Sequence, residues 1–133
     1  MASDPVHIAA KGAWGKVEWA IDLKGEMPAR DYYLKLPDED KAKVNTLFQR
    51  LADFGSITNW EKFRQLGEKA GAKAKGLCEF KSFQIRFIGD FRPGKRFIIA
   101  HGTRKKKDKL PQAEIEKAIR ILVEHDAREG GVQ

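Results

Sequence analysis

The stretch that decides the fold spans residues 79–111 and reads EFKSFQIRFIGDFRPGKRFIIAHGTRKKKDKLP. Apolar and polar residues alternate over residues 83–91, and apolar runs also occupy residues 77–81 and 96–101. Such short, alternating runs are typical of strands. Residues 92–95 read Arg-Pro-Gly-Lys, a turn signal, because proline fixes one torsion and glycine accepts a positive φ. The stretch therefore predicts three consecutive strands joined by short turns.

The same stretch holds the positive charge of the chain. Residues 81–109 contain ten Lys and Arg against two Asp, a net charge of +8, whereas the whole chain carries +7. A concentrated cationic surface on a folded sheet is typical of proteins that bind polyanions, most often nucleic acids. The charge pattern therefore favours a nucleic-acid partner.

Length and composition predict a single domain over residues 1–133, with residues 1–13 as a possible extra N-terminal segment. Apolar residues make up 41% of the 133 residues and charged residues 34%, as in a globular protein. The single cysteine, Cys78, excludes an internal disulfide and a multi-cysteine zinc site. No apolar run is long enough to span a membrane, and the N-terminus does not resemble a secretory signal, so we expect a cytoplasmic protein.

Outside the central stretch, periodicity predicts further elements. A period-two pattern predicts a strand over residues 16–23, and spacings of three and four predict a helical hairpin over residues 28–55. Residues 59–66 are interpreted as a turn of helix. The final helix is expected from Pro111 to about Asp126, with a core face of Ile115, Ala118, Ile119, Leu122 and Val123.

Together these elements predict an α+β fold. We expect a small, twisted, mainly antiparallel sheet made of an N-terminal strand and the three-stranded meander, with the helical hairpin between them and a helix at the C-terminus. The N-terminal strand should join an edge of the meander.

Arg86 is the strongest candidate for a binding residue. Strand alternation places it in mid-sheet on the face opposite to Ile85 and Phe87. A guanidinium on a rigid strand can hold a phosphate through two parallel hydrogen bonds. An ion pair with Glu79 or with an acid on the first helices is an equally good interpretation, and the sequence leaves both open.

His101 and the basic run over residues 104–109 are further candidates. A histidine has a near-neutral pKa that suits proton transfer to or from a ribose hydroxyl, although a structural hydrogen-bonding role is commoner at a strand end. The basic run fits either a solvated loop or a phosphate contact. The sequence has no Walker-type glycine loop, zinc signature or Gly-x-Ser-x-Gly elbow, so phosphodiester chemistry is expected to need no metal and no cofactor.

Several motifs, in order, resemble the RelE/ParE superfamily of bacterial toxins, in particular the phage-type HigB-like branch of toxin–antitoxin systems. The matching residues are Val17-Glu18-Trp19, Leu51-Ala52-Asp53-Phe54-Gly55, Glu79-Phe80-Lys81-Ser82, Gln84-Ile85-Arg86-Phe87, residues 96–102, Lys105-Lys106, and Leu110-Pro111 followed by Glu114-Ile115 and Ala118. The resemblance implies a RelE-like toxin that docks in the ribosomal A site and cuts mRNA. It also implies an antitoxin partner, often a helix-turn-helix protein.

The resemblance assigns roles to five residues. Arg86 would clamp a phosphate, Lys81 would contact phosphate or activate the 2′-hydroxyl, Arg104 and Lys105 would stabilise charge on the scissile phosphate, and His101 would lie close to the chemistry. The remaining cations of the stretch are expected to bind RNA: Arg92, Lys95, Arg96, Lys106, Lys107 and Lys109.

Two other functions remain open. A ParE-like protein on the same scaffold would poison DNA gyrase without cleaving RNA, and an inactive relative would only bind RNA or regulate. The sequence has no Tyr, Trp or Phe after Lys109, whereas many relatives of the nuclease branch carry a functional tyrosine or histidine near the C-terminus.

Overall fold

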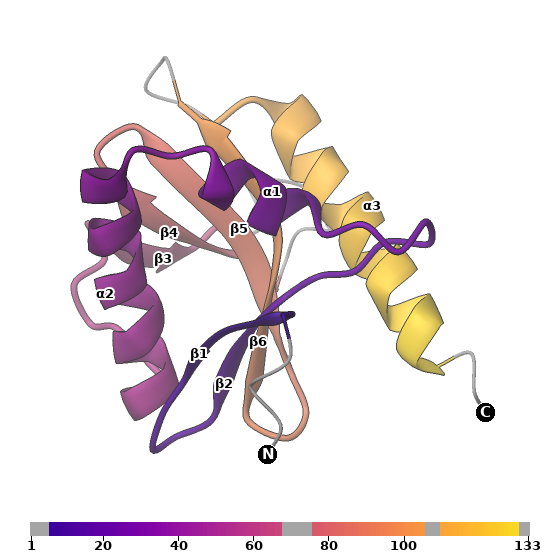
Figure 1. The fold of residues 1–133 in the computed structure, drawn as a ribbon, viewed down its shortest axis with the longest axis horizontal. Helices are drawn as coiled ribbons and strands as arrows, with labels where there is room; N and C mark the ends of the chain where they lie inside the picture. The colour runs from indigo at the N-terminus through magenta and orange to yellow at the C-terminus, as the bar shows by residue number, and fades with distance from the viewer. Residues whose placement is uncertain (1–5, 68–75, 106–109, 131–133) are drawn as a thin grey trace.

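The computed structural model describes residues 6–67, 76–105 and 110–130. These ranges form one six-stranded sheet and three helices (Figure 1). In chain order the elements are β1 (Ile8–Lys11), β2 (Lys16–Trp19), α1 (Pro28–Leu34), α2 (Asp38–Phe54), β3 (Phe63–Gln65), β4 (Cys78–Ser82), β5 (Ile85–Arg92), β6 (Arg96–Arg104) and α3 (Gln112–Gly130).

The strand order in the sheet is β1-β2-β6-β5-β4-β3. The central strands β4, β5 and β6 pair antiparallel as a meander, and β2 lies parallel to β6 at its edge. Strands β1 and β3 extend the sheet at its two ends, each antiparallel to its neighbour. The predicted α+β class, the meander and the position of the N-terminal strand are confirmed.

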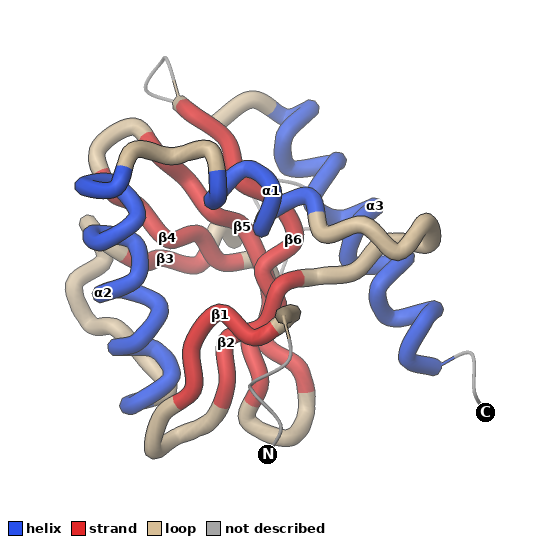
Figure 2. Tube along the Cα trace, viewed as in Figure 1, coloured by secondary structure: helices blue, strands red, loops and turns tan. Residues whose placement is uncertain are grey.

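Helices cover both faces of the sheet (Figures 1 and 2). The face under α1 and α2 holds an aromatic-rich core in which Phe48 makes edge contacts with Trp19, Phe80 and Phe87. The opposite face packs under α3 in a smaller aliphatic core that includes Ile88, Ile98, Ala100 and Ile121. Among the described residues, no helix has both the length and the hydropathy that a membrane crossing requires.

Local signals explain the boundaries of α2. Three carboxylates, on Asp38, Glu39 and Asp40, occupy its first turn, where they interact favourably with the positive end of the helix dipole. Gly55 ends the helix in the left-handed conformation, with φ of 74°, and donates its N–H to the carbonyl of Leu51.

Two local predictions are wrong. Residues 59–66 are not a helical turn, because Phe63–Gln65 forms the edge strand β3 and pairs with β4. In α3, the predicted core residue Val123 is 62% exposed, while Ile121 and His125 are buried. Aliphatic residues occur on several sides of α3, so the spacing of its apolar residues did not determine which side packs on the sheet.

One irregularity in β6 determines which side chains reach which face. Ile88 pairs with His101, but its neighbour Gly89 pairs with Ile99, so Ala100 is an extra residue in β6. His101 thereby shares the α3 side with Ile88, and Gly102 falls on the other side beneath Tyr32. A Cβ on Gly102 would lie 2.6 Å from Cδ2 of Tyr32, so only glycine fits there without a rearrangement.

Candidate functional site

A row of polar side chains crosses the sheet at one end of its α3 side. Lys81 of β4 pairs directly with Arg86 of β5, and Arg86 pairs with Thr103 of β6. Directly opposed residues of antiparallel strands project to the same face with Cβ atoms about 5 Å apart. Because α3 packs mainly over β6 and β5, it leaves this side of β4 more open. We call this row, with the adjacent Lys105, the open end of the sheet.

A buried carboxylate lies behind the row. Glu79 is completely buried, and its Oε1 accepts a hydrogen bond of 2.8 Å from Nε of Arg64. Its Oε2 is 4.0 Å from Nε of Arg86, and both of these buried atoms lack a hydrogen-bond partner. Of the two interpretations of Arg86 that the sequence left open, the contact with Glu79 is therefore present, but it is long and incomplete.

Arg86 also holds the turn between β4 and β5. Its Nη1 donates hydrogen bonds to the carbonyls of Phe83 and Ile85. Phe83 adopts a positive φ of 54°, which is unfavourable for a non-glycine residue, so these hydrogen bonds stabilise a strained turn. Only 7% of Arg86 is exposed, and burial lowers the pKa of its guanidinium, so its positive charge is incompletely compensated.

Lys81 is the titratable group of the open end that proton transfer could use. Partial burial lowers the pKa of its ammonium group, and the neighbouring cations Arg64, Arg86 and Lys105 lower it further, while Glu79 opposes the change. A lower pKa increases the neutral fraction of the amine near neutral pH, and the neutral amine can accept a proton.

His101 lies next to the row but faces α3. The residue is 6% exposed, and its Nε2 is 2.9 Å from Oε1 of Glu114 in the first turn of α3. Hydrogen bonds from His101 and Thr103 lower the pKa of Glu114, so its carboxylate is ionised and accepts from Nε2–H. Burial lowers the pKa of His101. The imidazole is thus positioned to link β6 to α3.

The basic run continues from the end of β6. Lys105 donates its backbone N–H to the carbonyl of Gln84, which ties it to the β4–β5 turn, and its charge acts on Lys81. Arg104 pairs with Ile85 and therefore projects to the opposite face, where its charge acts on Tyr32 of α1. The predicted RNA contacts Lys106, Lys107 and Lys109 lie outside the described residues.

The other predicted RNA contacts lie at the far end of the sheet. Arg92 and Arg96 are paired at the turn between β5 and β6, and Lys95 lies within that turn. Arg92 follows Arg86 by six positions along β5, or roughly 20 Å at the rise of a strand. The structure therefore does not gather the predicted cations into one surface.

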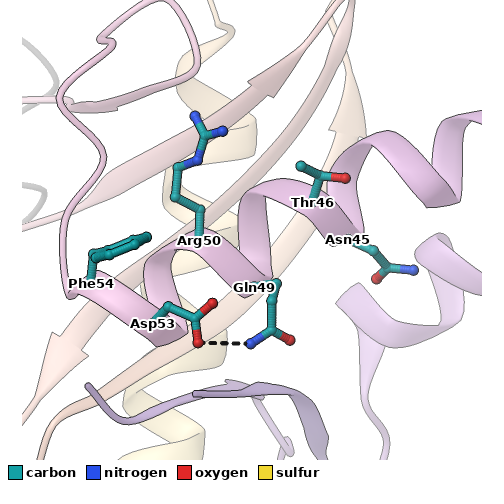
Figure 3. A pocket seen from close by; sticks show the side chains of 6 residues that line it. All are labelled: Asn45, Thr46, Gln49, Arg50, Asp53 and Phe54. Atoms are coloured by element: carbon teal, nitrogen blue, oxygen red, sulfur yellow. Dashed lines mark hydrogen bonds between the residues drawn. The ribbon is translucent and has the colours of Figure 1, made fainter. Parts of the chain in front are cut away.

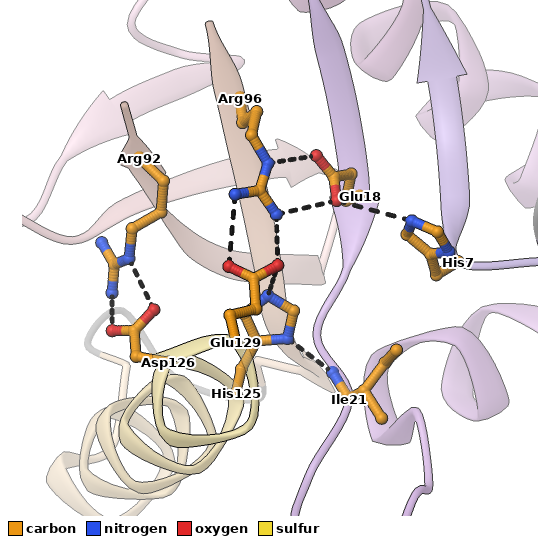
Figure 4. Close-up of polar contacts among 8 residues, drawn as sticks. All are labelled: His7, Glu18, Ile21, Arg92, Arg96, His125, Asp126 and Glu129. Atoms are coloured by element: carbon orange, nitrogen blue, oxygen red, sulfur yellow. Dashed lines mark hydrogen bonds and ion pairs between the residues drawn. The ribbon is translucent and has the colours of Figure 1, made fainter. Parts of the chain in front are cut away.

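Carboxylates neutralise the two arginines at this far end, which we call the closed end (Figure 4). Arg92 binds Asp126 of α3 through two hydrogen bonds of 2.8 and 2.9 Å. Arg96 binds Glu18 of β2 through two of 2.6 and 3.0 Å, and it also donates to Glu129 of α3. These hydrogen bonds raise the pKa of both guanidiniums. Their assignment as RNA contacts stays a prediction, and the ion pairs weigh against it.

A further feature of the surface lies apart from the open end. A hollow on the outer side of α2 is lined by Asn45, Thr46, Gln49, Arg50, Asp53 and Phe54 (Figure 3), none of which is a predicted site residue. Within the described ranges, no group of three or more His, Cys, Asp or Glu side chains could hold a metal ion.

Sequence reasoning missed two residues beside the open end, Arg64 and Glu114. The position of Arg64 was not predicted because residues 59–66 were interpreted as a turn of helix. In the strand β3, Phe63 points to the α2 side of the sheet, so alternation places Arg64 on the α3 side. Glu79 was predicted as one possible ion-pair partner of Arg86, and that pairing is present, whereas Glu114 was considered only as part of a motif. The first turn of α3 brings Glu114 to His101 and Thr103 of β6.

Comparison with known proteins adds a family assignment. Residues 31–123 match the model of a family described as phage-derived Gp49-like protein, DUF891. No curated protein matches the chain. The matched range contains the end of α1, all of α2, the whole meander and most of α3, including the open end. This family is toxin-like and implies a cognate antitoxin partner. The chain therefore belongs to the Gp49-like family, a toxin-like, RelE-like family of toxin–antitoxin systems.

Proposed function

We propose that this toxin is a ribosome-dependent mRNA endonuclease, of the HigB-like branch, whose active site is the open end of the sheet. The observation that carries the proposal is the direct pairing of Lys81 with Arg86, where nearby cations and burial leave positive charge under-compensated. A phosphate would supply the missing negative charge, and bound phosphate also relieves repulsion between neighbouring cations.

In this mechanism Lys81 acts as the general base. Its neutral amine takes the proton of a ribose 2′-hydroxyl, and the 2′-oxygen forms a bond to the adjacent phosphorus as the bond to the 5′-oxygen breaks. Arg86 and Lys105 stabilise the charge that develops on the phosphate oxygens. The leaving 5′-oxygen takes a proton from Lys105 or from water, and the products are a 2′,3′-cyclic phosphate and a 5′-hydroxyl.

The other predicted residues have supporting roles. Arg104 reaches the RNA from the opposite side of the strand end, and His101 positions Glu114 beside the row. Lys106, Lys107 and Lys109 extend the cationic surface beyond the chemistry. The antitoxin, proposed to be a helix-turn-helix protein, would have to cover the open end to block the toxin.

The test is translation in vitro followed by primer extension on the message, with and without ribosomes. Lys81→Ala should lower the rate of cleavage by about 100-fold, the effect typical of a lost general base. Arg86→Lys keeps the charge but loses the two-pronged geometry, and it should also be impaired. The matched control is Lys24→Ala, which removes one exposed lysine outside the predicted site residues and should leave cleavage unchanged. Equal cleavage by wild type and Lys81→Ala would refute the mechanism.

The second candidate is a ParE-like gyrase poison, favoured by the absence of an aromatic residue after Lys109. Induced expression followed by mapping of transcript ends and DNA breaks separates the two. Cuts within translated codons support the nuclease, and DNA breaks without such cuts support the poison.

A further inference from the structure

An exposed indole borders the open end of the sheet. Trp60 is 65% exposed and belongs to neither hydrophobic core. Its ring centroid is 5.8 Å from Nζ of Lys81, within the range of a cation–π contact. Single exposed apolar side chains are common on protein surfaces, and what distinguishes Trp60 is its contact with the proposed base.

The backbone beneath Trp60 is held in place by hydrogen bonds. Asn59 accepts from the N–H of Lys62 and Phe63 through its carbonyl and from Glu61 through its side-chain oxygen. The carbonyl of Lys62 in turn accepts from the N–H of Lys81, at 2.7 Å. The indole is therefore carried on a turn that is tied directly to the strand of the proposed base, and its ring face needs little ordering before it binds.

The other exposed aromatics of the described chain contact other elements. Phe83 belongs to the turn that Arg86 holds, but its ring is turned to α2, 4.4 Å from Nζ of Lys43, and Phe54 lines the hollow at the end of α2 (Figure 3). Of the remaining tryptophans, Trp19 is buried against Phe48, and the half-buried Trp14 packs edge-on against Phe91. Of these rings, only that of Trp60 contacts Lys81.

We propose that Trp60 is the platform on which one RNA base stacks, next to the nucleotide whose phosphate is held by Lys81 and Arg86. The proposal rests on the nuclease function proposed above and deepens it by naming a residue that selects the substrate. Aromatic side chains bind single-stranded nucleic acid by stacking, and sequence preference at such sites comes from stacking strength. Purines have the larger π surface, so Trp60 favours a purine beside the cut.

The experiment uses the full chain and a short RNA in which the reacting 2′-hydroxyl is replaced by hydrogen, so that it binds without being cut. Titration should quench the fluorescence of Trp60, and the same titration of Trp60→Leu measures the background from Trp14 and Trp19. Trp60→Leu should lose the quenching and bind about 10-fold more weakly, and Trp60→Phe should recover most of the affinity. The control Phe54→Ala removes an equally exposed ring from the far side of the sheet and should bind as wild type.

A second readout separates stacking from a structural role. In the ribosome assay Trp60→Leu should raise KM with little change in kcat, and its cuts should lose the purine preference. Unchanged affinity in Trp60→Leu, or an unquenched wild type, overturns the platform whether or not the protein is a nuclease. If quenching depends on Trp60 but the protein cuts no message, the stacking proposal holds and the nuclease function is refuted.

Discussion

The two ends of the β5–β6 hairpin carry similar arginines in opposite electrostatic states. At the closed end, carboxylates from β2 and α3 bind Arg92 and Arg96 and raise the pKa of both. At the open end, Nε of Arg86 is 4.0 Å from Oε2 of Glu79, and burial lowers the pKa of the guanidinium. A count of basic residues therefore overestimates the binding surface. An arginine that is already neutralised stabilises the fold, and one that is under-compensated can still gain energy from a ligand.

The largest expected effect tests whether the open end depends on its buried acid. Glu79→Ala leaves Arg86 buried without its counter-charge, and breaking a buried pair in this way costs about 3–5 kcal/mol. Urea unfolding should show this loss in the free energy of unfolding. Glu79→Gln, which keeps the volume and one acceptor, serves as the matched variant and should cost less. A loss below about 1 kcal/mol for Glu79→Ala would mean that Arg86 is compensated by something else.

An intermediate effect is expected at the closed end, and it should appear in stability alone. Arg96→Ala removes two hydrogen bonds to Glu18, a residue only 4% exposed, and should lower the free energy of unfolding by about 2 kcal/mol. Cleavage per folded molecule, measured in the ribosome assay, should not change. A specific loss of cleavage in a fully folded Arg96→Ala protein would show that the closed end also binds RNA, and the comparison between the ends would fail.

The smallest effect is a pH dependence that originates at the closed end. His125 is buried; its Nδ1 accepts a hydrogen bond from the N–H of Ile21, and burial lowers its pKa although Glu129 and Asp126 oppose this (Figure 4). With its folded pKa below the unfolded value of about 6.5, the unfolded chain binds more protons, so stability falls as the pH decreases below that value. The loss is at most about 1.4 kcal/mol per pH unit for one histidine.

Urea unfolding between pH 7.5 and 5.5 measures this slope, a range that lies above the usual carboxylate pKa values. His101, also buried with a lowered pKa, adds a slope of the same sign at the other end of α3. His125→Gln should therefore reduce the slope without abolishing it. An unchanged slope in His125→Gln would mean that His101 causes the whole pH dependence of stability and that the closed end contributes none of it.

Much of the fold could be predicted from the sequence because its signals are local. Alternation in the meander, the carboxylates of residues 38–40 and Gly55 each act within a few residues of the element they specify. The strand β3 was missed because Trp60, Phe63 and Leu66 are three apart, a spacing that also fits a helix. Only its pairing with β4 shows otherwise.

The candidate site was only partly predictable, for a different reason. Alternation identified Lys81 and Arg86 correctly as neighbours on one side of the sheet. It could not show that Arg92 and Arg96 are neutralised, because Asp126 and Glu129 lie more than thirty residues away and meet them only when α3 packs on the sheet. Nor could it show the extra residue in β6, which leaves no signature in side-chain type.

That extra residue, Ala100, makes the length of β6 a constraint on how the family can vary. Before it, Phe97 and Ile99 point toward α2; after it, the parity is reversed and Gly102 takes that side against Tyr32. Deletion of Ala100 would remove the bulge and leave His101 and Gly102 on their present sides, whereas strict alternation in a strand of the same length would turn the imidazole of His101 toward α2 and Gly102 away from Tyr32. A relative that keeps the length of β6 therefore needs the bulge to keep both layers in place, and one that loses the bulge has to lose its extra residue as well.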